Sequence, residues 1–242
     1  MNPLRKSSLT LLALPLCALT FAGVAPSVAN AAVKHPTVAS LLKAANAALL
    51  SEDSVHVKVS TISGKVASSV IADIGKTSGR ESYHSGDESF TISVTPTYAY
   101  LSGSKEGLIK LMDLTEVEQQ KVGTHAIAMK KGSSPYTTFD SNLTSSTFAN
   151  LLPHAKGTTL LAKRDAATCG YQLSWHETAT SSSPASTTVI TISAGKKALP
   201  LKESVTTSEG KSKTTFTQWG EAVKVTAPTS TVSYTKIFPT SK

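Results

Sequence analysis

Residues 55–66 read VHVKVSTISGKV, and this stretch predicts the kind of fold that most of the chain adopts. Val55, Val57 and Val59 alternate with polar residues, which is the period of a strand with one buried face. The residues Ser63-Gly64-Lys65 then favour a tight turn into a second strand. The stretch therefore predicts a β-hairpin.

Similar strand-like runs recur along the 242-residue chain, separated by short polar breaks. Ser and Thr together exceed a quarter of the chain, and Thr and Val suit strands better than long helices. The strands are expected at residues 55–59, 66–74, 76–84, 89–94, 98–102, 126–130, 170–177, 187–193, 199–207, 213–219 and 223–226. Helices are expected at residues 36–50, 108–112, 115–122 and 146–152, and residues 135–145 are expected to form a loop.

This order of elements predicts the fold class. Strands joined by hairpins favour one antiparallel sheet, and an open sheet of about ten strands curls. The curled sheet has to bury its apolar concave face, and the helices are the available cover. The sequence therefore predicts an α+β fold, with a single strongly curved antiparallel sheet forming a half-barrel and helices covering the concave face. Residues 32–242 would form this one domain.

The first 31 residues have the features of a secretory signal peptide. Arg5 and Lys6 precede an apolar stretch over residues 9–24, and residues 29–31 read ANA, a small-x-small cleavage pattern. We expect cleavage between Ala31 and Ala32, and a secreted or cell-envelope location outside the cytoplasm.

The two cysteines add little chemistry. A lipid anchor at Cys17 is not expected, because lipoprotein processing favours a small residue before the cysteine and Leu16 stands there. Once the signal is removed, Cys169 has no cysteine to pair with, and we interpret it as a semi-buried structural residue.

Composition and motifs argue against several function classes. The net charge is +8, but only 6% of residues are aromatic and arginine is rare, so nucleic-acid binding is not favoured. Ser40 and Lys43 match a Ser-x-x-Lys pattern, which the many Ser and Lys residues explain by chance. The six histidines do not share metal-ligand spacing on one helix face. We expect no metal, no cofactor and no catalytic activity.

The C-terminal third carries a family resemblance. Residues 195–197 read GKK and residues 199–202 read LPLK, followed by Trp219-Gly220 and Pro228. Together with the helix ending near Leu50, this order of elements over residues 36–228 resembles the LppX/LprG-type actinobacterial lipoprotein family, relatives of the LolA/LolB carriers. The resemblance implies a hydrophobic cavity on the concave side of the sheet, binding of an acylated lipid or glycolipid, and transport in the cell envelope.

We therefore expect an apolar ligand site between the sheet and the helices. Its candidate residues are Val57, Val59, Ile92, Val94, Leu111, Met112, Leu151, Leu152, Leu173, Trp175, Ile190 and Ile192. The expected partners are a lipid or glycolipid ligand and an anionic membrane surface, with the protein itself a monomer. The alternative is a filled core and a LolA-like protein-interaction or regulatory module. A connected apolar cavity of roughly 300–1,000 Å³ would favour the carrier.

Overall fold

The computed structural model describes residues 36–145, 148, 152, 161–165, 170–180 and 183–239. The expected signal peptide, its cleavage site at Ala31 and Ala32, and both cysteines lie outside the described residues. Most of the expected helix at residues 146–152 lies outside them as well, including Leu151.

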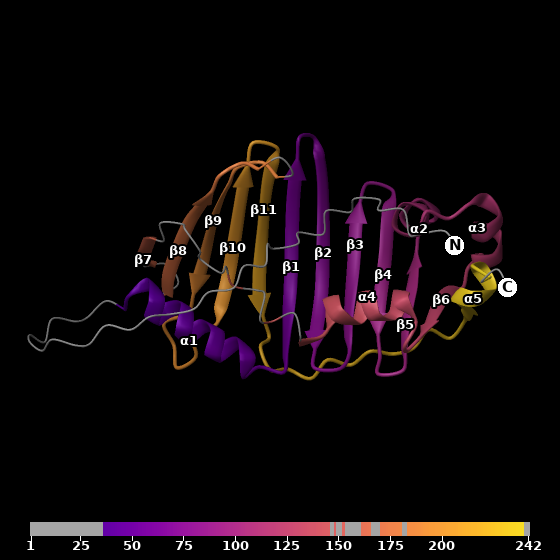
Figure 1. Ribbon diagram of the computed structural model, residues 1–242, viewed down its shortest axis with the longest axis horizontal. Helices are drawn as coiled ribbons and strands as arrows, with labels where there is room; N and C mark the ends of the chain where they lie inside the picture. The colour runs from indigo at the N-terminus through magenta and orange to yellow at the C-terminus, as the bar shows by residue number, and fades with distance from the viewer. Residues whose placement is uncertain are drawn as a thin grey trace, which may run out of the picture. The chain divides into compact units, whose positions relative to one another are not determined.

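The described residues contain twelve strands and five helices (Figure 1). The strands are β1 (Ser54–Ser63), β2 (Val66–Gly75), β3 (Gly79–Ser85), β4 (Glu88–Val94), β5 (Tyr98–Gly103), β6 (Ala126–Lys130), β7 (Leu161–Asp165), β8 (Gly170–Glu177), β9 (Ser186–Ile192), β10 (Pro200–Thr207), β11 (Gly210–Thr217) and β12 (Thr231–Ser233). The helices are α1 (Val38–Leu50), α2 (Lys105–Met112), α3 (Glu116–Val122), α4 (Ser134–Leu143) and α5 (Tyr234–Ile237).

The predicted fold class is confirmed. The described strands belong to one mostly antiparallel sheet that does not close, and a few helices accompany it. The chain divides into two compact units. Within the described residues, the first unit comprises residues 52–145 and 209–239, and the second comprises residues 36–51, 148, 152, 161–165, 170–180 and 183–208.

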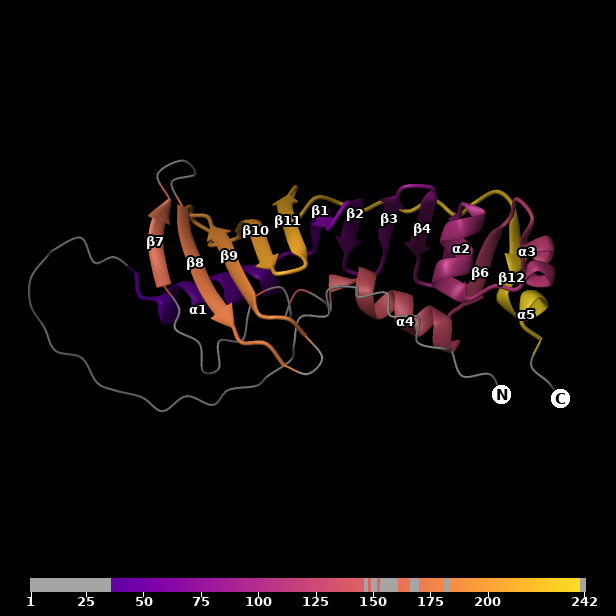
Figure 2. The same ribbon diagram turned by 90° about the horizontal axis from the view of Figure 1, so that it is seen from above.

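The first unit holds eight strands in the order β12-β6-β5-β4-β3-β2-β1-β11. Neighbours pair in antiparallel fashion, except that β12 runs parallel to β6. Helix α2 packs on β4 and β5, and α4 packs across β2 to β6. Figure 2 shows α4 along one side of β2, β3 and β4. These two helices therefore cover one face of the first unit's strands.

The covered face is apolar because the alternation expected from the sequence is present. On β4, Phe90, Ile92 and Val94 are buried, and Leu101 lies opposite Ile92 on β5. Directly opposed residues in an antiparallel pair share a face of the sheet. The resulting cluster continues through Ile127 and Met129 of β6 to the buried side of α2.

The second unit holds β7 to β10 in the order β10-β9-β8-β7, all paired in antiparallel fashion. Leu173 of β8 lies opposite Ile190 of β9, and both side chains are fully buried. Helix α1 belongs to this unit. Its N-cap is Thr37, whose side chain accepts a hydrogen bond from the Ser40 amide, so the expected helix at residues 36–50 is confirmed with a start near Val38.

Two expectations about secondary structure are wrong. Residues 135–145 are not a loop, because α4 occupies Ser134–Leu143 with Ser133 as its N-cap. Its threonines are poor helix formers, and the hydroxyls of Thr137 and Thr138 bond to carbonyl oxygens one turn earlier, which does not favour a helix. Packing of α4 against β2 to β6 outweighs this local preference. Residues 223–226 are not a strand. Instead of pairing with another strand, this segment packs against the end of β2: a Cβ added to Gly75 would lie 2.9 Å from the Cβ of Val223.

Candidate functional site

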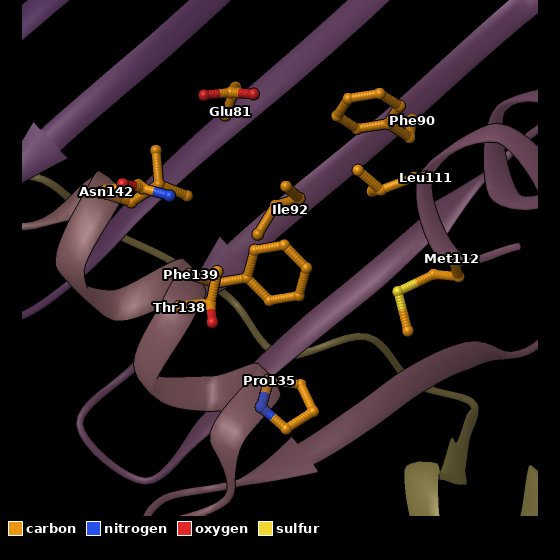
Figure 3. Close-up of a pocket in the computed structure, with 10 residues that line it drawn as sticks. Glu81, Phe90, Ile92, Leu111, Met112, Pro135, Thr138, Phe139 and Asn142 are labelled. Carbon is orange, nitrogen blue, oxygen red and sulfur yellow. The ribbon is translucent and has the colours of Figure 1, made fainter. Parts of the chain in front are cut away.

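The first unit contains an apolar cavity of about 160 Å³ between its sheet and the helices α2 and α4 (Figure 3). The lining residues come from β3, β4, α2 and α4. They are Glu81, Phe90, Ile92, Leu111, Met112, Pro135, Thr138, Phe139, Asn142 and Leu143. Apart from Glu81, Thr138 and Asn142, every one of these side chains is apolar.

The floor of the cavity follows from the register of β3 and β4. Glu81 lies opposite Ile92, and Tyr83 lies opposite Phe90, so all four side chains point to the same face. The rings of Tyr83 and Phe90 stack with centroids 4.8 Å apart. This stack fixes the ring of Phe90 at the edge of the cavity.

Helix α2 is held against β4 at its start. The Ser104 hydroxyl caps the helix by accepting from the Gly107 amide, and it also accepts a 3.0 Å hydrogen bond from the Ser89 amide. Gly107 lies so close to β4 that a Cβ on it would be 2.2 Å from the carbonyl oxygen of Ser89. This close approach brings the other end of α2, with Leu111 and Met112, over the cavity.

Gly107→Ala is expected to displace α2 from β4, because a Cβ has no room against the backbone of Ser89. Forcing additional atoms into a packed site typically costs about 1–3 kcal/mol. We expect a loss of that order in the free energy of unfolding, measured in urea, although alanine is the better helix former. Gly132→Ala is the control. A Cβ on Gly132 meets no neighbouring atom, but the residue has a positive φ of 87°, so this variant measures the cost of backbone strain without a steric clash. An unchanged or raised stability for Gly107→Ala would contradict the close packing.

Helix α4 is fixed at both ends. Near its start, the buried Tyr136 hydroxyl donates a 3.0 Å hydrogen bond to the carbonyl oxygen of Thr95, in the turn between β4 and β5. Burial, and to a lesser extent Asp140, raises the pKa of Tyr136 above its ordinary value of 10, so the hydroxyl keeps its proton and this hydrogen bond over a wider range of alkaline pH. At its end, the carbonyl group of Leu143 packs directly against Gly79 of β3. A Cβ on Gly79 would lie only 2.0 Å from that carbonyl oxygen, so only glycine fits there. Helix α4 therefore forms a fixed wall over β3 and β4.

Glu81 is the ionisable residue of the cavity lining. Its side chain lies between Ala72 of β2 and Ile92 of β4. Among the residues that the structure describes, no hydrogen-bond or ion-pair partner reaches its carboxyl group. Burial raises the pKa of Glu81 above its ordinary value of 4.5, because an apolar environment disfavours the charged form.

Glu81→Gln is expected to stabilise the folded protein at neutral pH, because the amide carries no charge to desolvate. A raised pKa in the folded state means that stability falls as pH rises from 4.5 through the folded-state value. The stability advantage of Glu81→Gln over the parent protein should therefore be small near about pH 4 and largest near about pH 8. Thermal melts across this range measure it. Tyr83, two residues further along β3, is the other ionisable side chain on the same face of that strand. A gain that is equal at all pH values would show that desolvation of the carboxylate is not the cause.

The structure brings together three of the residues expected at the site, Ile92, Leu111 and Met112. Val57 and Val94 are buried in the first unit without lining the cavity, and Val59 is half-buried. The remaining candidates described belong to the second unit, where Leu152, Leu173, Trp175, Ile190 and Ile192 are buried.

Sequence reasoning missed seven lining residues. Phe90 carried a signal, because it stands two residues before Ile92 on the same face of β4. Pro135, Phe139 and Leu143 recur every four residues, which is a helical period that the expectation of a loop concealed. Nothing in the sequence singled out Glu81, Thr138 or Asn142.

A second, polar cavity of about 150 Å³ lies at the ends of β1 and β2, with His56, Asp73 and Lys224 among its lining residues. The Nδ1 atom of His56 lies 2.6 Å from an oxygen of Asp73. No set of three or more His, Cys, Asp or Glu residues in the described part of the chain could hold a metal ion.

No family model and no curated protein matches the chain. The solved structures that are similar to it include two mycobacterial proteins. The Mycobacterium tuberculosis lipoprotein LppX is 14% identical over 77% of this chain and 96% of its own, with a TM-score of 0.47. LprF from Mycobacterium bovis is 13% identical over 78% of this chain and 95% of its own, with a TM-score of 0.46.

Proposed function

We propose that the protein is a non-enzymatic carrier that binds an acylated lipid or glycolipid, with a segment of acyl chain in the cavity under α2 and α4. The observation that carries this proposal is the apolar lining of that cavity, built from two strands and two helices. Shielding an acyl chain from water needs an apolar surface and no catalytic group. The family resemblance seen in the sequence supports the same function.

The volume of the cavity limits what it holds. At about 160 Å³ it is close in size to an engineered protein cavity of about 150 Å³ that binds benzene. It therefore accommodates about six carbon atoms, and burying that many methylenes contributes about 5 kcal/mol before entropy losses. This volume is below the roughly 300–1,000 Å³ expected of a carrier, so the size of the cavity does not by itself favour that function over a filled core.

A longer acyl segment needs the lining to adjust, and α2 supplies the side chains that can do so. Met112 is unbranched and has a flexible thioether, so it adapts to different chain shapes. Leu111 is half-buried and stands beside it at the end of the helix. We propose that these two side chains change rotamer when the ligand enters.

The proposed place of action is outside the cytoplasm, following the signal peptide expected at residues 1–31, with no lipid anchor at Cys17. No helix in the described residues is long and apolar enough to cross a membrane. Without Arg5 and Lys6 of the signal peptide, the net charge falls from +8 to +6, which would still attract the monomer to an anionic membrane surface where the ligand is collected or delivered. Salt should weaken that attraction.

The alternative function is a non-enzymatic interaction module. One observation favours it: Ile62 and Val66, beside the turn of the β1–β2 hairpin, are 59% and 61% exposed. Ile62 lies opposite Ala67 and Val66 opposite Ser63, so the two side chains point to opposite faces of the hairpin, and a partner protein would have to contact both sides of the hairpin end. In this case the cavity would be a packing defect that binds nothing.

Titration with an acyl chain that carries an environment-sensitive fluorophore distinguishes the two functions. The carrier predicts saturable binding at one site, and competition by an unlabelled acyl lipid of the same chain length. Ile62→Ser combined with Val66→Ser is the matched control, because it changes the exposed hairpin and leaves the cavity intact. Absent or unsaturable binding to the parent protein would contradict the carrier.

A further inference from the structure

Glu81 places an ionisable carboxyl group on the apolar face of the first unit, among apolar side chains. Its strand neighbours Ala72 and Ile92 are apolar, while Arg80, the adjacent residue in sequence, points to the opposite face of β3. Lys110 of α2 is bonded to Glu88 instead. Glu81 is half-buried, and partly burying a charge without a partner is unfavourable, so such groups concentrate at functional sites.

The polar lining residues gather on one side of the cavity. Figure 3 shows Glu81 and Asn142 on the side away from Leu111 and Met112. Asn142, near the end of α4, is exposed, so this polar side opens to solvent. The lining of the cavity therefore suits an amphipathic ligand, whose apolar part would lie under α2 and whose polar part would lie beside Glu81.

We propose, building on the carrier function, that Glu81 and Asn142 bind the polar end of a neutral acyl lipid through one of its hydroxyl groups. A hydroxyl donates to the Glu81 carboxylate and accepts from the Asn142 amide, which uses both capacities of that group. A fatty-acid carboxylate has no hydrogen to donate, and it would place a second negative charge beside Glu81. The site thus selects hydroxyl-bearing lipids over free fatty acids.

The test compares two probes that share a ten-carbon chain, 1-decanol and decanoate, by displacement of the fluorescent acyl probe near neutral pH. The parent protein is expected to bind decanol about tenfold more tightly or better. Glu81→Leu should remove this preference by improving decanoate binding and weakening decanol binding. Glu81→Gln, which keeps the shape and an acceptor oxygen, should lose part of it. Asp87→Asn, in the exposed β3–β4 turn, removes one negative charge elsewhere and should leave the preference unchanged.

The outcomes separate this inference from the function on which it rests. If the parent binds both probes equally, or if Glu81→Leu keeps the preference, Glu81 does not select the head group and the carrier function stands. If the parent binds neither probe nor the fluorescent chain, the carrier function fails and this inference fails with it. Melting curves for each variant establish that the protein tested is folded.

Discussion

Leu111→Trp is expected to weaken acyl-chain binding by at least about a hundredfold while the protein stays folded. Leu111 lines the cavity from the last turn of α2 and is only half-buried, so an indole ring has a route into the empty volume. Burying about six methylenes of the acyl chain contributes up to about 5 kcal/mol to binding. A hundredfold loss of affinity corresponds to about 2.7 kcal/mol, so it requires the indole to remove only about half of that contribution.

Ile109→Trp provides the matched control for this variant. Ile109 lies two residues earlier on the same helix, is 36% exposed and is absent from the cavity lining. The control adds the same ring to the same helix and should bind the fluorescent acyl probe like the parent. Equal binding by Leu111→Trp and the parent, in folded proteins, would show that the acyl chain does not occupy this cavity.

Leu101→Ala is expected to lower the free energy of unfolding by about 2–5 kcal/mol. Leu101 is fully buried on β5, opposite Ile92 of β4 on one side and Ile127 of β6 on the other. Removing its side chain leaves a void in the apolar cluster on which α2 packs, and neighbours held in a sheet relax into it only partly.

Urea denaturation measures the effect, with Val117→Ala as the control. Val117 is 62% exposed on α3, so its truncation should change stability by less than about 0.5 kcal/mol. A loss at Leu101 no larger than the loss at Val117 would contradict the assignment of β4, β5 and β6 to one packed face.

The strands were predictable where one face is buried and the other is solvated. The alternation of Val55, Val57 and Val59 identifies β1, and the turn at Gly64 identifies the hairpin with β2. Gly64 has a positive φ of 58°, the conformation for which glycine is favoured in such turns. The capping box of α3 was predictable for a similar local reason, since the Thr115 and Glu118 side chains each bond to the other residue's backbone.

Elements whose evidence is not local were missed. Strand β12 has three residues and exists because it pairs in parallel with β6, about a hundred residues earlier in the chain. Helix α4 contains residues that locally favour turns, and the Tyr136 hydroxyl bond to Thr95 stabilises it from another part of the chain. Sequence periodicity does not reveal such pairings.

The candidate site was predictable only in part. Ile92, Leu111 and Met112 followed from apolar periodicity, which shows that a side chain is buried but not whether it faces a cavity or other side chains. Glu81 stands on the buried face of β3, against the preference of a carboxyl group for water. Its importance comes from the register with Ile92, which the sequence does not specify.

Native mass spectrometry of the protein purified from its own host tests the central claim most directly. The carrier function predicts that the parent retains a lipid, that organic extraction releases an acyl-bearing molecule, and that Leu111→Trp purified in the same way carries none. A parent protein that is free of lipid, and that does not take up an acyl lipid when one is supplied, would contradict it.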